Sequence, residues 1–129
     1  MMRLAILSLV LLSFASTSLA ADGTVDKARL QAAMQQHIER NLVDGAILHL
    51  DTETGQVKPL YPTQAHPMIL AMGDYFILCA DLRDKDGNSM PLDLYMAPRG
   101  RSFAVFHSEI DNRTFLKKLM KDGTVKPLR

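Results

Sequence analysis

The sequence predicts an α+β fold in which an N-terminal helix packs on an antiparallel β-meander and a short helix follows near the C-terminus. Three observations predict it: an apolar stripe at helical spacing over residues 25–42, several short strand-like segments joined by turns, and a second amphipathic segment over 112–121. An apolar helix stripe and an apolar sheet face must bury each other, so a two-layer domain is expected.

The first twenty residues have the pattern of a secretory signal peptide. A positive start at Arg3 precedes an apolar run over 4–14, and Ser18 and Ala20 are small residues at the −3 and −1 positions of a cleavage site. We therefore expect cleavage near Ala20, a single domain over 21–129, and a periplasmic or secreted protein. No later apolar stretch approaches the ~20 residues of a spanning helix, so no membrane span is expected.

The next two elements are a long helix and a hairpin. Residues 25–42 place apolar side chains three and four positions apart, which is the stripe that a helix presents to a core. Asp44-Gly45 is expected to end this helix, because glycine suits a left-handed stop. Residues 46–50 and 56–60 then form a hairpin, and the stretch 61–67, with its two prolines, is expected to be a loop or an irregular edge.

A second hairpin has the clearest pattern in the chain. Residues 74–82 and 89–96 flank the turn at Asp86-Gly87. Pairing Leu82 with Met90 makes one whole face apolar, and a slip of one residue would reverse the faces. The pairs on that face are Ala80 with Leu92, Leu78 with Leu94, and Phe76 with Met96. The other face is mixed, carrying Tyr75, Ile77, Cys79 and Asp81 opposite Ala97, Tyr95, Asp93 and Pro91, and we expect it to be partly covered.

The remaining residues complete the meander and add the short helix. A turn at 98–100 leads into a strand over 102–107. Asp111 is expected to cap a helix over 112–121, and Gly123 is expected to stop it. Residues 125–129 are expected to be a short tail.

This order of elements resembles the cystatin-like and PepSY-like layouts. The segment Asp51-Thr52-Glu53-Thr54-Gly55-Gln56-Val57 is similar to the D-x-x-T-G-x-V hairpin that is common in small secreted PepSY-type domains. The motif covers seven residues, and the layout covers most of residues 21–129. The resemblance implies a binding or inhibitory module rather than an enzyme, and it assigns no functional residue here.

Charge and cysteine content exclude several classes of protein. The chain has 15 basic and 14 acidic residues, and the two numbers become equal once Arg3 leaves with the signal. Such a balance argues against a nucleic-acid-binding protein, which needs a basic face to neutralise phosphates. Cys79 is the only cysteine, so an intramolecular disulfide is impossible and the disulfide-rich extracellular scaffolds are excluded.

Two metal sites can be considered from residue type. His66, Met68, Met72 and Cys79 offer imidazole, thioether and thiolate ligands that suit copper, although methionines in an apolar run also serve as core fillers. Asp84, Asp86 and Asn88 surround Gly87 as in a calcium loop. In that frame Leu82 would occupy the first ligand position, which favours a solvated hairpin turn instead.

Cys79 is also the candidate nucleophile of a small hydrolase or redox enzyme. Asp93 lies directly opposite it in the predicted register and should raise its pKa, which argues against catalysis. An exposed Cys79 could instead join two chains if the mixed sheet face were a homodimer interface.

We therefore expect a small exported binding module with no catalytic residues and no cofactor. Its partner is expected to be a protein or peptide, or a second copy of the chain, but not nucleic acid. The interface candidates are aromatic and apolar residues of the mixed sheet face and arginines of the adjacent turn: Tyr75, Ile77, Tyr95, Arg99 and Arg101. A soft-metal binding or chaperone protein and a cysteine-dependent enzyme remain the alternatives.

Overall fold

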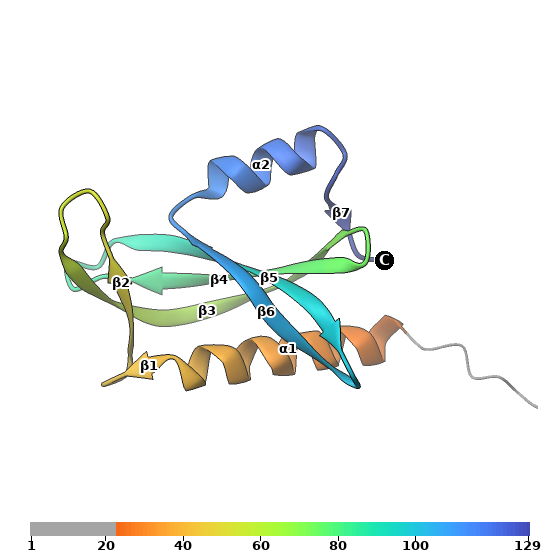
Figure 1. The fold of residues 1–129 in the computed structure, drawn as a ribbon, viewed down its shortest axis with the longest axis horizontal. Coiled ribbons are helices and arrows are strands. Elements are labelled where there is room, and N and C mark those ends of the chain that lie inside the picture. The colour runs from red at the N-terminus through yellow and green to blue at the C-terminus, as the bar shows by residue number, and fades with distance from the viewer. Residues whose placement is uncertain (1–22) are drawn as a thin grey trace, which may run out of the picture.

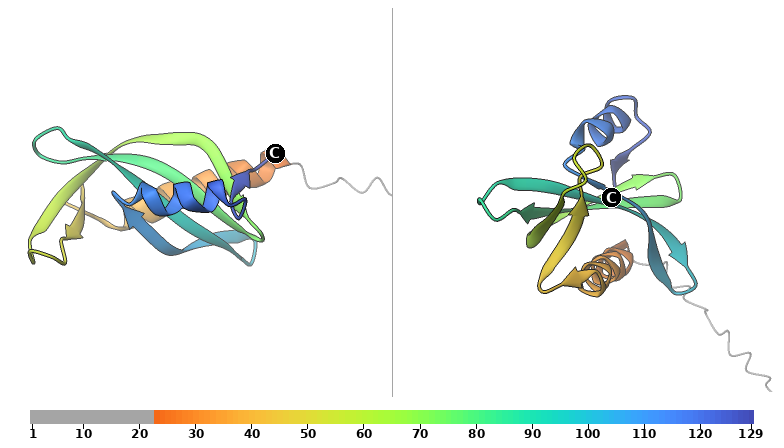
Figure 2. Two further views of the ribbon diagram at one scale, coloured as in Figure 1. Left: turned by 90° about the horizontal axis from the view of Figure 1, so that it is seen from above. Right: turned by 60° about the vertical axis from the view of Figure 1, so that its left-hand side comes forward.

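The fold places two helices on opposite faces of one antiparallel sheet. A computed structural model describes residues 23–129, and the predicted signal peptide and its cleavage site lie outside these residues. Helix α1 (Gly23–Arg40) runs along one face, and helix α2 (Arg113–Lys121) lies over the other (Figure 1). The turned view of Figure 2 shows the sheet between the two helices. The predicted α+β class is confirmed, with α2 adding a partial third layer.

The strands follow one another across the sheet in sequence order. They are β1 (Leu42–Val43), β2 (Ala46–Leu50), β3 (Val57–Met72), β4 (Tyr75–Arg83), β5 (Ser89–Arg99) and β6 (Ser102–Ile110), and β7 (Lys126–Pro127) pairs with β3. Every pairing is antiparallel, and short turns join the consecutive strands from β1 to β6. Within residues 23–129, none of the helices combines the length and the apolarity that crossing a bilayer requires.

The register predicted for the second hairpin is confirmed. Leu82 pairs with Met90, and the three further pairs of the apolar face follow it. This face packs on α1, so Leu78 and Leu94 share the main core with Leu30 and Met34 of the helix. Burying one face of each strand against one stripe of the helix excludes a shifted register, because a shift would expose the apolar set.

Of the two forms predicted for residues 61–67, the loop is wrong and the irregular edge is confirmed, because β3 continues through these residues and pairs there with β4 alone. The strand bends there through two irregularities, between Pro62 and Gln64 and between Ala65 and Ile69. Proline cannot donate to a β-ladder, but it is tolerated where the ladder is locally interrupted. Pro62 borders the first irregularity and Pro67 lies inside the second, so one long strand accommodates both.

Two predicted helix ends also differ from the structure. Gly45 lies in the turn between β1 and β2 with φ +81°, and α1 has already ended at Arg40. Asp111 does not cap α2: Asn112 occupies the cap position, and its side chain makes no capping hydrogen bond. Instead α2 is fixed on the sheet by Arg113 at its start and by the buried Leu116.

The second sheet face and α2 enclose a smaller core. Its buried side chains come from three strands, from α2 and from the segment after it: Leu70, Ile77, Cys79, Tyr95, Leu116 and Val125. The residues expected to form a tail thus contribute Val125 to this core and β7 to the sheet.

Candidate functional site

A bulge in β3 opens a groove beside α2. Ala65 pairs with Ala80 and Ile69 pairs with Leu78, so the three residues 66–68 stand opposite the single residue Cys79. Pro67 at the centre of this bulge has no N–H to offer to β4. A groove of about 290 Å³ lies between the bulge and α2.

Apolar and sulfur-containing side chains make up most of the groove. Leu70, Cys79 and Leu116 are its buried lining. Met68 and Met120 stand at its exposed margins, from β3 and α2 respectively. Methionine is unbranched and polarisable, so these margins can adapt to the shape of an occupant.

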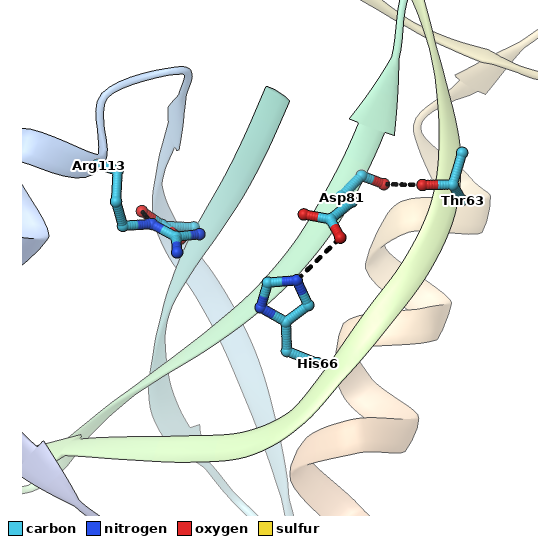
Figure 3. A network of polar contacts seen from close by, with 5 residues as sticks. Thr63, His66, Asp81 and Arg113 are labelled. Carbon is cyan, nitrogen blue, oxygen red and sulfur yellow. Dashed lines mark hydrogen bonds and ion pairs between the residues drawn. The ribbon is translucent and has the colours of Figure 1, made fainter. Parts of the chain in front are cut away.

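A buried ion pair holds the start of α2 against the sheet. Asp93 of β5 is 1% exposed. Arg113 donates to it twice, from Nε to Oδ2 at 3.1 Å and from Nη2 to Oδ1 at 2.8 Å. Figure 3 shows the Arg113 side chain reaching from α2 toward the strands. Such a bidentate pair fixes orientation as well as charge, so it sets where α2 lies and hence the width of the groove.

Cys79 at the base of the groove is held as a neutral thiol. Burial raises the pKa of Cys79 to about 12, and a hydrogen bond to Asp93 and the charge of that carboxylate act in the same direction. Thiolate is the nucleophilic form of cysteine, so this environment does not activate the residue. The opposition of Cys79 and Asp93 follows directly from the predicted register.

Tyr95 lies beside this pair with its hydroxyl buried. The Tyr95 hydroxyl has no hydrogen-bond partner among the described residues. Burial raises the pKa of Tyr95 to about 12, and the charges of Asp93 and Glu109 add to the effect. The Tyr95 ring contacts His107 edge-on and lies near Phe115, with centroid separations of 5.4 and 6.2 Å.

The soft-metal candidates are only partly brought together. His66, Met68 and Cys79 line the same groove, whereas Met72 packs against the smaller core beneath α2. His66 Nε2 is 3.0 Å from Asp81 Oδ2, and the backbone carbonyl of Asp81 accepts a hydrogen bond from the Thr63 hydroxyl (Figure 3). Within the described part of the chain, no three His, Cys, Asp or Glu side chains are grouped as metal ligands would be.

Sequence reasoning did not assign Met120 to this site. Met120 belongs to the helix predicted over residues 112–121, and in the structure it is 42% exposed and lines the groove. The sequence of a helix shows which of its residues are apolar. Which of them lie at the edge of its contact with the sheet depends on the angle at which the helix packs.

The predicted interface residues lie in two different environments. Ile77 and Tyr95 are buried beneath α2, whereas Tyr75 is exposed and its ring contacts Phe106 edge-on at 5.3 Å. Arg99 and Arg101 are exposed on the β5–β6 hairpin. Since α2 lies over Ile77, Cys79 and Tyr95, a homodimer formed through these side chains would require α2 to move away.

The aspartate-rich β4–β5 turn is closed by its own hydrogen bonds. Asp84 Oδ1 accepts the backbone N–H groups of Asp86 and Asn88 at 2.9 Å each, and Asp84 Oδ2 accepts the Asn88 side chain at 3.0 Å. The backbone of Gly87 has φ +84°, which favours glycine at this position. These features account for the Asp-Gly sequence as a hairpin turn.

Compared with models of protein families, with curated proteins and with solved structures, the chain gives no significant match. The resemblance to cystatin-like and PepSY-like domains therefore stays a prediction that depends on the layout and the hairpin motif alone.

Proposed function

We propose that the protein is a small exported, non-catalytic binding module that recognises a protein or peptide segment through the groove between α2 and β3. The segment would present an apolar side chain next to a carboxylate, as a peptide C-terminus does. The observation that carries the proposal is an apolar groove with methionines at its margins and a lysine-bearing helix along one side.

The size of the groove favours a single side chain as its occupant. Small-molecule pockets generally enclose ~300–1,000 Å³, and this groove of about 290 Å³ lies at the lower limit. Burial of an apolar side chain against Leu70 and Leu116 would supply most of the binding free energy, at about 25 cal/mol per Å² of apolar surface removed from water.

The charge of α2 favours a carboxylate at the rim. Lys117 borders the groove, and Lys118 and Lys121 extend the positive charge along the same helix, which contains no acidic residue. Arg113 also lines the groove, but its charge is already balanced by Asp93. Lys117 is therefore the residue that we expect to attract the anionic end of the segment.

The state of Cys79 supports binding rather than chemistry at this site. A pKa of about 12 leaves the residue protonated at neutral pH, and α2 limits access to it. The small hydrolase or redox enzyme is accordingly the weakest of the three candidate functions.

A pair of matched probes tests the proposal. N-acetyl-leucine carries the carboxylate, and N-acetyl-leucine amide differs only in lacking the charge. We expect both to shift the methyl NMR signals of Met68 and Met120 saturably, and the charged probe to bind roughly twofold more tightly, since an exposed ion pair contributes ~0.5 kcal/mol. The Met90 methyl, on the opposite face, should not respond.

Two variants of matched exposure provide the control. Met68 is 58% exposed at the groove and Val57 is 57% exposed at the start of β3. Met68→Gln should weaken binding of both probes and Val57→Gln should not, while Lys117→Gln should abolish the preference for the charged probe. Absence of a saturable shift, or equal effects of Met68→Gln and Val57→Gln, would exclude the groove as the binding site.

A soft metal is the second candidate occupant, because His66, Met68, Met120 and Cys79 line one groove. The pairing of His66 with Asp81 and the raised pKa of Cys79 both oppose it. The double variant Met68→Leu/Met120→Leu distinguishes the two functions, since it keeps the groove apolar and removes both thioethers. Copper(I) affinity that falls in this variant, with probe binding retained, would support the metal site; no copper(I) retention by the unmodified protein would exclude it.

A further inference from the structure

We propose that a second site, on the opposite side of the sheet, binds an oxyanion: the carboxylate or phosphate group of a small ligand. The site is the cleft between α1 and β6, with a volume of about 320 Å³. Arg40 and Arg99 would supply the charge, and Gln36 and Ser102 would supply neutral hydrogen-bond donors.

The cleft is formed by one side of α1 and by the β5–β6 hairpin. Ala33, Gln36, His37 and Arg40 are spaced at i, i+3, i+4 and i+7, so they form a single stripe along the helix. Arg99 ends β5, and residues 102–105 of β6 complete the lining. Figure 1 shows β6 running down toward α1, which brings these distant segments together.

The charge of the cleft is uncompensated. Its lining includes two arginines and a histidine but no carboxylate. Within residues 26–129, where side chains are described, the ion pairs involve Lys58, His66, His107 and Arg113, and neither Arg40 nor Arg99 is among them. Both guanidinium groups line the cleft, so an anion bound there would be attracted by two positive charges.

The neighbouring hollow provides a contrast within the same molecule. Arg29 and Arg101 line it together with Asp26 and Asp74, so cationic and anionic side chains are equal in number there. The excess of positive charge is thus a property of the cleft between α1 and β6, not of every arginine-containing surface on this side of the sheet.

His37 reports the electrostatic potential in the cleft. Partial burial lowers the pKa of His37, and the charge of Arg40 lowers it further. The charged groups that line the cleft with His37 are Arg40 from α1 and Arg99 from β5, both positive. An anion bound between them would oppose this effect and raise the pKa of His37, which gives a direct readout of binding.

The chemistry of the side chains suits an oxyanion in particular. Guanidinium groups donate paired N–H groups whose geometry matches the oxygens of a carboxylate or a phosphate. The lining residues His37 and Arg40 belong to the last turn of α1, where the negative end of the helix dipole opposes an anion, so the charges of Arg40 and Arg99 must outweigh that effect. The site lies across the sheet from the groove at α2, so it can exist whether or not the proposed peptide binding does.

NMR titration of the histidine side chains tests the inference with the protein as it exists. The pH dependence of all four histidine signals is recorded in chloride, in inorganic phosphate and in succinate at equal ionic strength. We expect the pKa of His37 to rise saturably by about 0.5 or more with at least one oxyanion, whereas His49 on β2 should not respond. The more effective anion identifies the group, phosphate or carboxylate, that the site prefers.

Variants separate specific binding from general screening. Arg40→Gln and Arg99→Gln should each reduce the anion-dependent rise in the pKa of His37 at least threefold, and Arg83→Gln, on an exposed arginine at the end of β4, should leave it unchanged. Amide NMR spectra establish that each variant is folded. A pKa of His37 that is the same in all three salts, or that rises equally in all three variants, would overturn the proposal.

Discussion

Replacing Arg113 with methionine should leave the carboxylate of Asp93 buried without a charged partner. Asp93 is 1% exposed, and both of its oxygens accept hydrogen bonds from this one guanidinium, at 2.8 and 3.1 Å. Methionine would preserve much of the side-chain length without supplying a donor. The variant therefore removes one partner of the pair and leaves the other buried.

The expected loss is large for a single substitution near the protein surface. Breaking a buried ion pair from one side costs about 3–5 kcal/mol, because the remaining charge is uncompensated. The Arg113 side chain is 30% exposed, so water can partly solvate the vacated position and we expect a value near the lower limit. A loss of about 3 kcal/mol corresponds to a decrease in Tm of roughly 12 °C for a domain of this size.

Urea denaturation followed by circular dichroism measures the effect. Removing both charges in Asp93→Leu/Arg113→Met should restore much of the lost stability, since a buried pair can often be exchanged for apolar residues. Lys117→Met, an exposed change on the same helix, should alter the free energy of unfolding by less than about 0.5 kcal/mol. A loss below about 1 kcal/mol in Arg113→Met, or a double variant no more stable than the single one, would refute this account of how α2 is held.

Three further predictions follow from the core, from Cys79 and from the turn carboxylates. Leu78→Ala, at a fully buried site beneath α1, should cost about 2–5 kcal/mol of unfolding free energy in urea titrations, whereas Leu48→Ala at a half-exposed site should cost less than about 1 kcal/mol; equal losses would contradict the assigned core. Cys79, with its pKa raised to about 12 by burial, should react with a thiol reagent at pH 8 at least ~100-fold more slowly in the folded protein than in urea, and comparable rates would show that the thiol is accessible. A hydrogen bond from the Asn88 side chain holds the pKa of Asp84 below its ordinary value, and the backbone N–H of Glu53 does the same for Asp51. The stabilising contribution of these two carboxylates is complete above their ordinary pKa of 3.8 and is lost as the pH falls through the lowered pKa. The urea midpoint should therefore decrease as the pH falls below that ordinary value, and Asp84→Asn should lessen the decrease.

The candidate site was predictable only in part. The opposition of Cys79 and Asp93 followed from the alternation of side chains along two strands, and with it the expectation of a suppressed nucleophile. The bulge at residues 66–68 did not follow, because the number of residues opposite Cys79 depends on how β3 curves between its partners. The prolines were correctly recognised as an interruption, but they interrupt the ladder and not the strand.

The cationic cleft illustrates a different limit. Arg99 was identified from its basic turn, but the spacing over residues 25–42 identified only the apolar stripe of α1, and nothing in the sequence relates Arg99 to Arg40. Their common cleft depends on the angle at which β6 passes α1. That angle results from the twist of the whole sheet, to which every strand contributes.

The sequence by itself determined the order of the main helices and hairpins, the register of the second hairpin and the face of the sheet that packs on α1, but not the short strands β1 and β7. These depend on local periodicity, because side chains alternate along a strand and recur every three or four residues on a helix. Only the tertiary structure decided that α2 covers the second face, that Arg113 neutralises Asp93, and that a groove and a cationic cleft lie on opposite sides of the sheet. Those features arise from contacts between segments far apart in the chain, and their geometry is set by packing rather than by any local pattern.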